Sequence, residues 1–150
     1  ALDIVKLNLV GTRASGVYPS NPERYSAFEE EIVSPCAGEV IETKDGQPDH
    51  RGSGTDRKNP AGNHIVVRCQ NTDPAVDVAL AHMTRGSVVV EKDEEVEEGT
   101  VLGKVGNSGN TSEPHLHVHA VRTGSGKILE GEGVPVEFNG RFLVRGSLVF

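Results

Sequence analysis

The sequence predicts an all-β fold, a sandwich or a barrel, and three observations support this. Apolar, often β-branched runs bounded by Gly, Pro, Asn and Asp recur about every 8–12 residues. No segment keeps a 3.6-residue apolar period over about 11 residues, as an amphipathic helix would. The chain holds 18 Gly and 8 Pro, too many for a helix bundle. Its 150 residues fit a single domain.

Ten strands are expected, and Val, Ile and Leu dominate most of them. They span residues 2–9, 31–34, 38–43, 64–69, 76–82, 86–90, 100–105, 115–122, 134–138 and 141–149. The one helical candidate is residues 21–31, where Asn21 precedes Pro22 as a cap precedes a first-turn proline. This segment is only a weak candidate for a short helix or turn. Residues 44–63, with four Gly and two Pro, predict a long surface loop, and residues 106–114 predict a tight polar one.

The composition excludes several classes of partner. The formal net charge is −7 and the densest charge run, residues 91–98, is acidic, so nucleic acid is a poor partner. No apolar run approaches the roughly 18 residues that span a bilayer.

Cys36 and Cys69 lie outside any CxxC pattern and could form one disulfide or remain two buried thiols. The chain starts directly with a strand-like segment, which predicts a fragment or a processed product.

Three of the six histidines alternate in one predicted strand. His115, His117 and His119 therefore share one face, while the residues between them face the core. Imidazole is the commonest metal ligand and titrates near neutrality, which favours a metal or acid–base site over an inert surface. His82 closes another apolar run. A catalytic zinc site needs three protein ligands, and spacing alone does not choose the carboxylate among Asp3, Asp49, Asp56 and Asp73.

Five stretches, in order along the chain, resemble motifs of the lysostaphin-type zinc endopeptidases, which cut peptide cross-bridges in bacterial peptidoglycan. The most specific is Gly-Asn-Ser-Gly at 106–109 followed by Pro-His-Leu-His at 114–117. The motif at 96–103 is weak, because lipoyl-type carrier domains share it. The five stretches are VSPCAGEV at 33–40, AGNHIVV at 61–67, LAHM at 80–83, VEEGTVLG at 96–103, and the 106–117 segment.

The resemblance implies an antiparallel β-sandwich or open barrel with a long surface loop, and it implies site residues. His117 and Asp3 would bind Zn²⁺, and His115 and His82 would be catalytic. A further histidine ligand is implied a few residues before the aspartate, where this chain has only Ala1 and Leu2. Residues 1–150 are therefore expected to be one peptidase-like domain, truncated at its N-terminus. His119 is expected to face solvent or to support the site from outside the ligand set.

The expected function is that of a zinc-dependent endopeptidase, which hydrolyses peptide cross-links of peptidoglycan through a metal-activated water. Such an enzyme is extracytoplasmic: periplasmic, cell-wall bound or secreted. The alternative is a catalytically inactive domain of the same fold that binds cell-wall peptide or regulates a partner hydrolase. A carrier domain is disfavoured, because no Lys occupies the hairpin apex that would be modified.

Overall fold

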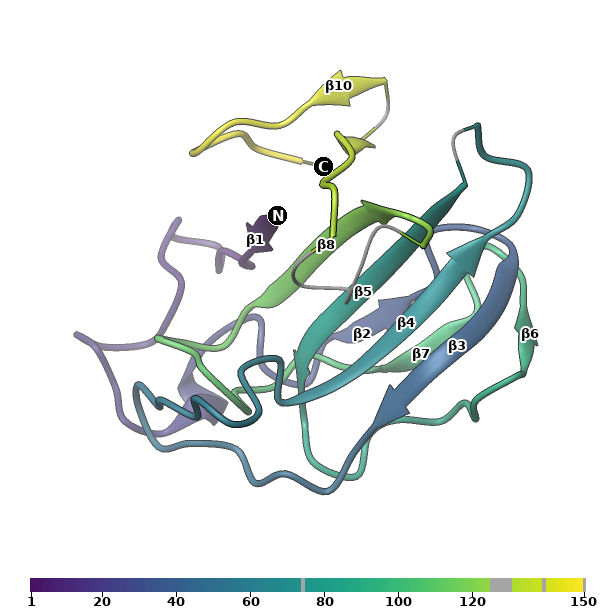
Figure 1. The fold of residues 1–150 in the computed structure, drawn as a ribbon. Helices are drawn as coiled ribbons and strands as arrows, with labels where there is room; N and C mark the ends of the chain where they lie inside the picture. Colours follow the sequence, from purple (N-terminus) through teal and green to yellow (C-terminus); the bar gives the residue numbers. More distant parts are fainter. Residues whose placement is uncertain (74, 125–130, 139, 150) are drawn as a thin grey trace.

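A computed structural model describes residues 1–73, 75–124, 131–138 and 140–149. Six antiparallel strands form the main sheet, in the order β1-β8-β5-β4-β3-β6 (Figure 1). Strands β2 and β7 form a second sheet, and β9 and β10 form a hairpin. The strands are β1 (Leu2–Ile4), β2 (Glu31–Val33), β3 (Gly38–Lys44), β4 (Asn63–Cys69), β5 (Val76–Met83), β6 (Glu95–Val96), β7 (Val101–Lys104), β8 (Leu116–Arg122), β9 (Glu137–Phe138) and β10 (Arg141–Phe142).

The hydrophobic core lies between the main sheet and the β2–β7 pair. Alternate residues of the central strands supply one side of it, such as Ile65 in β4 and Leu80 in β5. Ile32 and Leu102 supply the other side from β2 and β7, and both are almost completely buried. The main sheet does not close on itself, since β1 and β6 end its order. The predicted all-β antiparallel sandwich is thus confirmed in its open form.

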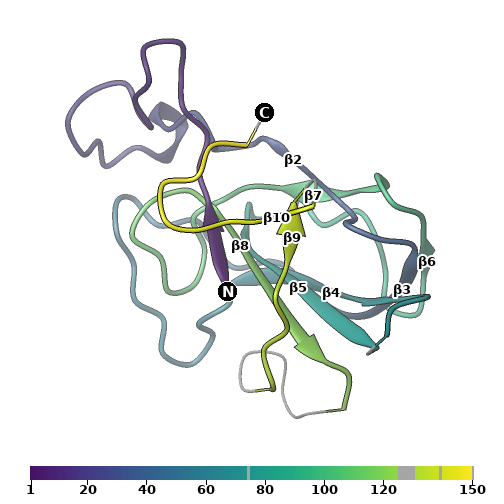
Figure 2. The same ribbon diagram turned by 90° about the horizontal axis from the view of Figure 1, so that it is seen from above.

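The opposite face of the main sheet is unusual because its central strand carries small residues. Ala79 and Ala81 of β5 lie beside His119 and His117 of β8 in the antiparallel register. Alanine methyl groups leave room above this face for neighbouring imidazole rings. Figure 2, viewed from above, shows β1 running along the outer edge of β8. The fold therefore places one edge strand next to the histidine-bearing strand.

Several predicted elements are shorter than expected. The first strand ends at Ile4, and the Asn8 side chain then accepts hydrogen bonds from the backbone N–H groups of Val10 and Thr12, which turns the chain. The 21–31 segment contains a single 3₁₀ turn, Pro22–Arg24, capped by Asn21. The 134–138 and 141–149 strands are reduced to the two-residue strands β9 and β10.

Two predictions near the acidic segment are wrong. Residues 86–90 form no strand, because the Asp45 carboxylate accepts hydrogen bonds from the Gly86 and Val88 N–H groups and holds a turn there. In contrast, β6 forms inside the acidic run, where no strand was predicted. Val96 is buried in the core and draws this segment onto β3 despite the charges around it.

A disulfide joins Cys36 to Cys69, which decides between the two alternatives that the sequence left open. The bond ties the turn before β3 to the end of β4, and Cys69 belongs to the core. The bridged residues are 33 apart in sequence, so the cross-link restricts a long loop of the unfolded chain.

Replacing both cysteines by serine is expected to lower the free energy of unfolding by about 2–4 kcal/mol, because the unfolded chain regains that loop entropy. Urea denaturation of the oxidised protein and the double variant measures the difference. Adding a reductant to the unmutated protein should reproduce most of the loss, and no loss in either experiment would contradict the prediction.

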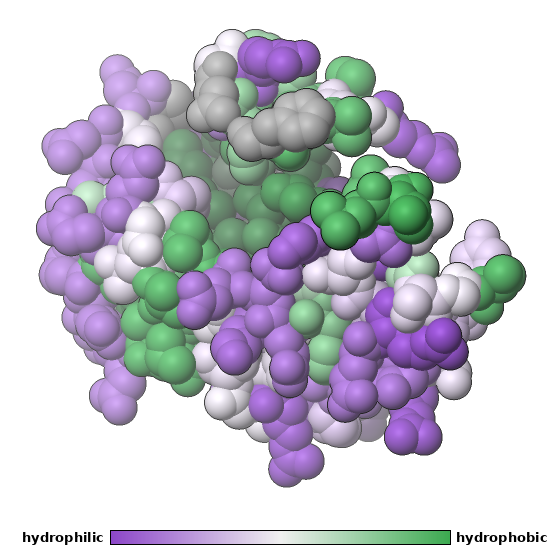
Figure 3. Space-filling view, turned by 180° about the vertical axis from the view of Figure 1, so that it is seen from behind, coloured by the Kyte–Doolittle hydropathy of each residue, from purple (hydrophilic) through white to green (hydrophobic). Residues whose placement is uncertain are grey.

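The surface is mostly hydrophilic, with separate groups of hydrophobic side chains on the face seen from behind (Figure 3). The exposed large apolar residues include Leu9, Val10, Val17, Phe142, Val144 and Leu148. Within the part of the chain that the structure describes, no helix has the length and apolar character to cross a membrane.

Candidate active site

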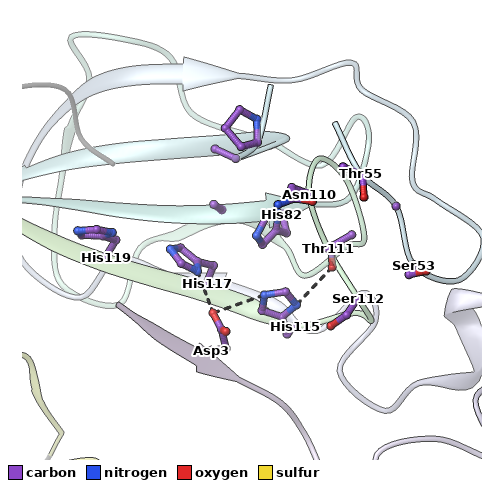
Figure 4. A pocket seen from close by; sticks show the side chains of 14 residues that line it. Asp3, Ser53, Thr55, His82, Asn110, Thr111, Ser112, His115, His117 and His119 are labelled. Atoms are coloured by element: carbon purple, nitrogen blue, oxygen red, sulfur yellow. Dashed lines mark hydrogen bonds and ion pairs between the residues drawn. The ribbon is translucent and has the colours of Figure 1, made fainter. Parts of the chain in front are cut away.

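Four predicted site residues from three strands or their ends meet at one place. The ring nitrogens of His82, His115 and His117 lie within 4.8 Å of one another. The Asp3 carboxylate joins them: its Oδ1 is 2.8 Å from His117 Nδ1 and 3.6 Å from His115 Nε2 (Figure 4). Residues more than 110 positions apart in sequence are therefore in hydrogen-bond contact. A carboxylate beside several imidazoles is a donor set suited to a divalent cation such as zinc.

Strand pairing explains this convergence. Asp3 of β1 lies directly opposite His117 of β8, and Ala81 of β5 lies opposite the same histidine on its other side. Facing residues in an antiparallel pair project from the same side of the sheet. His117 is thus flanked by the carboxylate on one strand and by the chain leading to His82 on the other. The prediction that Val118 and Ala120 face the core is confirmed, because both are buried in it.

The hydrogen bonds of His82 and His115 fix which ring nitrogen carries the proton. His82 Nδ1 is 2.8 Å from the Ser108 carbonyl oxygen, and His115 Nδ1 is 2.7 Å from the Glu113 carbonyl oxygen. A carbonyl can only accept, so both Nδ1 atoms donate, and in the neutral rings both Nε2 atoms keep a free lone pair. The partner of the His117 Nδ1 is a side chain instead of a backbone carbonyl, because this nitrogen faces the Asp3 carboxylate.

His82 occupies a strained backbone position. Its φ of 63° is in the left-handed region, which non-glycine residues seldom adopt. The conformation is held from both sides: His82 N–H donates to the Ala61 carbonyl, and Gly106 N–H donates to the His82 carbonyl. Burial, and secondarily the nearby His115, lower the pKa of His82 to about 4. The ring is therefore neutral at pH 7, and such over-determined strain is typical of functional positions.

A groove of about 640 Å³ opens over the cluster, and mostly small side chains line it. Residues 53–55, 60–61 and 110–112 line one side of it. The 53–55 and 110–112 stretches are joined by a short antiparallel bridge, in which Gly54 and Thr111 exchange backbone hydrogen bonds of 2.8 and 3.0 Å. The 44–63 segment, predicted as a long surface loop, therefore contributes residues 53–55 and 60–61 to the lining of the groove (Figure 4).

The sequence and the fold both resemble those of known proteins. The sequence model that describes peptidase family M23 matches residues 24–129. The chain belongs to peptidase family M23. The lysostaphin catalytic domain from Staphylococcus simulans superposes with a TM-score of 0.53 at 17% identity, covering 89% of this chain and 86% of that one. The catalytic domain of the prophage-encoded M23 protein EnpA from Enterococcus faecalis gives 0.52 at 17% identity, over 89% and 85%. No curated protein sequence matches significantly.

The chain covers half the length of intact lysostaphin, with a TM-score of 0.53 at 16% identity. At such identities the likeness concerns the fold, so the roles of individual side chains in this M23 domain rest on its own geometry. Of the other aspartates considered from the sequence, none lines the groove. Asp49 and Asp56 instead accept backbone N–H groups within their loop and its neighbours, and Asp73 is exposed. His119 lines the groove beyond His117 and is half-buried, and burial lowers its pKa.

A buried polar network behind the groove was missed at the sequence level. The Asn107 side chain donates to the carbonyls of His50 and Gly52, at 2.9 and 2.8 Å, and its Oδ1 accepts from Thr111 Oγ1. Asn107 is fully buried and every polar atom of its amide is satisfied. It thereby fastens the 44–63 loop of the M23 domain to the 106–114 loop. The only sequence signal was its place in the Gly-Asn-Ser-Gly motif, which carried no role by itself.

A second part of this network supports His82. Ser108 Oγ donates a hydrogen bond to the Met83 carbonyl and accepts one from the Asn63 N–H. The Ser108 carbonyl accepts a hydrogen bond from His82 Nδ1. The Asn63 side chain, also fully buried, donates to the same Met83 carbonyl and to that of Gln47. The imidazole of His82 is thus oriented by a loop that buried side chains hold on both sides.

Asn107→Ala is expected to lower the free energy of unfolding by about 2–4 kcal/mol, because it removes a fully buried amide and leaves the half-buried carbonyls of His50 and Gly52 without the donor that binds them. Urea denaturation measures it. Asn110→Ala is the matched control, since Asn110 is exposed at the groove and its side chain has no hydrogen bond within the described residues. A similar loss in both variants would show that burial of the amide is not the cause.

Proposed function

We propose that this M23 domain is a zinc-dependent endopeptidase that hydrolyses peptide cross-links of bacterial peptidoglycan. One observation carries the proposal: the Asp3 carboxylate meets His117 and His115 at the floor of an open groove, with His82 beside them. The M23 membership supplies the reaction class, since the family is one of peptidases. The peptidoglycan substrate rests on the motif resemblance to lysostaphin-type enzymes.

Asp3 and His117 are the proposed zinc ligands in this chain. Two ligands of a tetrahedral zinc ion with bonds of about 2.0–2.2 Å lie about 3.3–3.6 Å apart. Asp3 Oδ1 and His117 Nδ1 are 2.8 Å apart, at hydrogen-bond distance. A small outward shift of either side chain would therefore let both bind one zinc ion. When bound, zinc would acidify a water molecule and polarise the scissile carbonyl.

His82 and His115 are the proposed acid–base residues. Each donates its Nδ1 proton to a backbone carbonyl, so each has Nε2 available to accept a proton or, once protonated, to donate one. Burial keeps His82 neutral at pH 7, which suits a proton acceptor or a neutral hydrogen-bond donor. The two rings lie with centroids 4.8 Å apart, so both can reach the same reacting peptide. Either ring can take the proton from water on its Nε2 and then pass that same proton to the leaving amine.

The proposed location is outside the cytoplasm, in the periplasm, in the cell wall or secreted. A peptidoglycan substrate requires it, and the Cys36–Cys69 disulfide agrees with an oxidising compartment. The proposed partner is a peptidoglycan peptide, and residues 1–150 are proposed to act as one peptidase domain.

The experiment is metal analysis combined with hydrolysis of purified cell-wall peptides, using residues 1–150 and a form extended upstream of Ala1. We expect one zinc ion per chain, loss of zinc from His117→Ala, and peptide cleavage that a chelator abolishes. If neither zinc nor cleavage appears in either form, the proposal is wrong. Binding of peptide without cleavage in both forms would favour the alternative, a catalytically inactive domain of the same fold that binds cell-wall peptide.

A further inference from the structure

The charges of the 44–63 loop are arranged differently from those of the rest of the molecule. The chain has 22 acidic and 15 basic residues. In this loop, however, four cations stand against three aspartates: Lys44, Arg51, Arg57 and Lys58, with Asp45, Asp49 and Asp56. The loop also forms one wall of the groove, through residues 53–55 and 60–61. Its charge therefore borders the place where a substrate would lie.

All three aspartates of the loop are engaged with backbone N–H groups. Asp45 accepts from Gly86 and Val88, and Asp49 accepts from Arg85 and Asn107. Asp56 accepts from the N–H groups of residues 58 and 59, which lowers its carboxyl pKa. These carboxylates thus shape the loop, and within the described residues none forms an ion pair with Arg51, Arg57 or Lys58.

Three of the cations have no such engagement. The side chains of Arg51, Arg57 and Lys58 are exposed and make no ion pair within the described residues, whereas Lys44 bonds to Asn59. Arg57 and Lys58 sit in the turn between the two groove-lining stretches, 53–55 and 60–61. Arg and Lys side chains are long and flexible, so these two can reach over the groove rim from that turn.

The neighbouring 110–112 stretch offers no free carboxylate to neutralise them. Glu113, next to that stretch, is paired with Arg13. Asp3 is occupied by the histidine cluster at the groove floor. The loop beside the groove therefore carries one net positive charge and three exposed cations without an ion pair in the described residues, Arg51, Arg57 and Lys58, which we call the cationic rim, in a molecule that is acidic overall. Such a rim attracts anions while the rest of the surface repels them.

We infer that the cationic rim recognises a carboxylate of the bound peptide, so that the domain prefers peptides with a free acidic side chain near the cleaved bond over their amidated counterparts. This inference rests on the proposed function, because it assigns the same groove to a peptide. The small residues lining the groove accept a peptide backbone, and the rim adds selection by charge. Exposed ion pairs contribute modestly, so the preference is a few-fold and is screened by salt.

The test measures binding by the metal-free chain, which keeps it independent of hydrolysis. The probes are acetylated and amidated Ala/Gly hexapeptides with one Glu at each position in turn, and the same peptides with Gln. Titrations followed by NMR at low and high salt give Kd. We expect one Glu peptide to bind about 3–10-fold more tightly than its Gln counterpart at low salt, with the difference lost at about 1 M salt.

The variant Arg57→Gln/Lys58→Gln should remove this difference and leave Kd for the Gln peptide unchanged. Lys92→Gln/Lys104→Gln is the charge-matched control, because both lysines are exposed and neither lines the groove. Equal affinity for Glu and Gln peptides, no binding of any peptide, or an equal effect of Lys92→Gln/Lys104→Gln would overturn the inference. A glycerol-phosphate oligomer that binds while the peptides do not would also overturn it, in favour of a phosphodiester polymer. Absence of zinc or cleavage would leave the binding result intact and would count only against the proposed function.

Discussion

His115→Ala is expected to lower kcat for peptide hydrolysis by about 10²–10⁴-fold while zinc stays bound. His115 is buried, its Nδ1 is committed to the Glu113 carbonyl, and its Nε2 lies 3.6 Å from the Asp3 carboxylate. The variant therefore removes one acid–base group at the reacting centre but keeps Asp3 and His117. Steady-state kinetics on a cell-wall peptide, together with metal content, separate loss of chemistry from loss of metal.

His119→Ala is the matched control for this prediction. His119 comes from the same face of β8 and lines the same groove, but its ring lies beyond His117, with ring centroids 6.1 Å apart. No contact joins it to Asp3 within the described residues. We expect kcat to change by no more than about threefold. If both variants lose activity equally, or if His115→Ala retains it, the assignment of His115 as an acid–base residue is wrong.

The convergence of Asp3, His82, His115 and His117 was expected from the resemblance to lysostaphin-type enzymes, because alternation alone gave only the shared face of the histidines and spacing did not choose Asp3. Strict alternation placed His117 and His119 on one face of β8, with His115 directly before the strand, and the structure sets β1 beside it. The pairing of Asp3 with His117 then needed only the correct register. A one-residue slip would have put the carboxylate on the core side, so the register is enforced by burial of the opposite face.

The supporting network could not be predicted, because it depends on contacts between loops rather than on periodicity. Nothing in a polar loop sequence states that Asn107 reaches His50 and Gly52 across more than 50 positions. Strand β6 escaped prediction for the related reason that the burial of Val96 outweighs its acidic surroundings. Tertiary contacts override local preference in such short segments.

The largest effect on stability is expected from Gly109→Ala, which should lower the free energy of unfolding by about 3–5 kcal/mol. Gly109 has a φ of 81°, which disfavours any side chain. An added Cβ would also lie 2.4 Å from Gly62 N and 2.7 Å from the Pro60 carbonyl oxygen, both backbone atoms that cannot swing aside. Urea denaturation measures the loss.

Gly99→Ala separates the two causes, because Gly99 has a similar φ of 85° but an added Cβ there would meet nothing within 4 Å. We expect it to cost only about 1–2 kcal/mol, the backbone penalty alone. The excess at Gly109 then measures the close approach of the 106–114 loop to residues 60–62. Since Ser108 in that loop orients His82, Gly109→Ala should also weaken the His82 Nδ1–H hydrogen bond, visible in the imidazole ¹⁵N shifts. Equal losses at both glycines would mean that the loops can separate freely, and that their packing does not hold His82 in place.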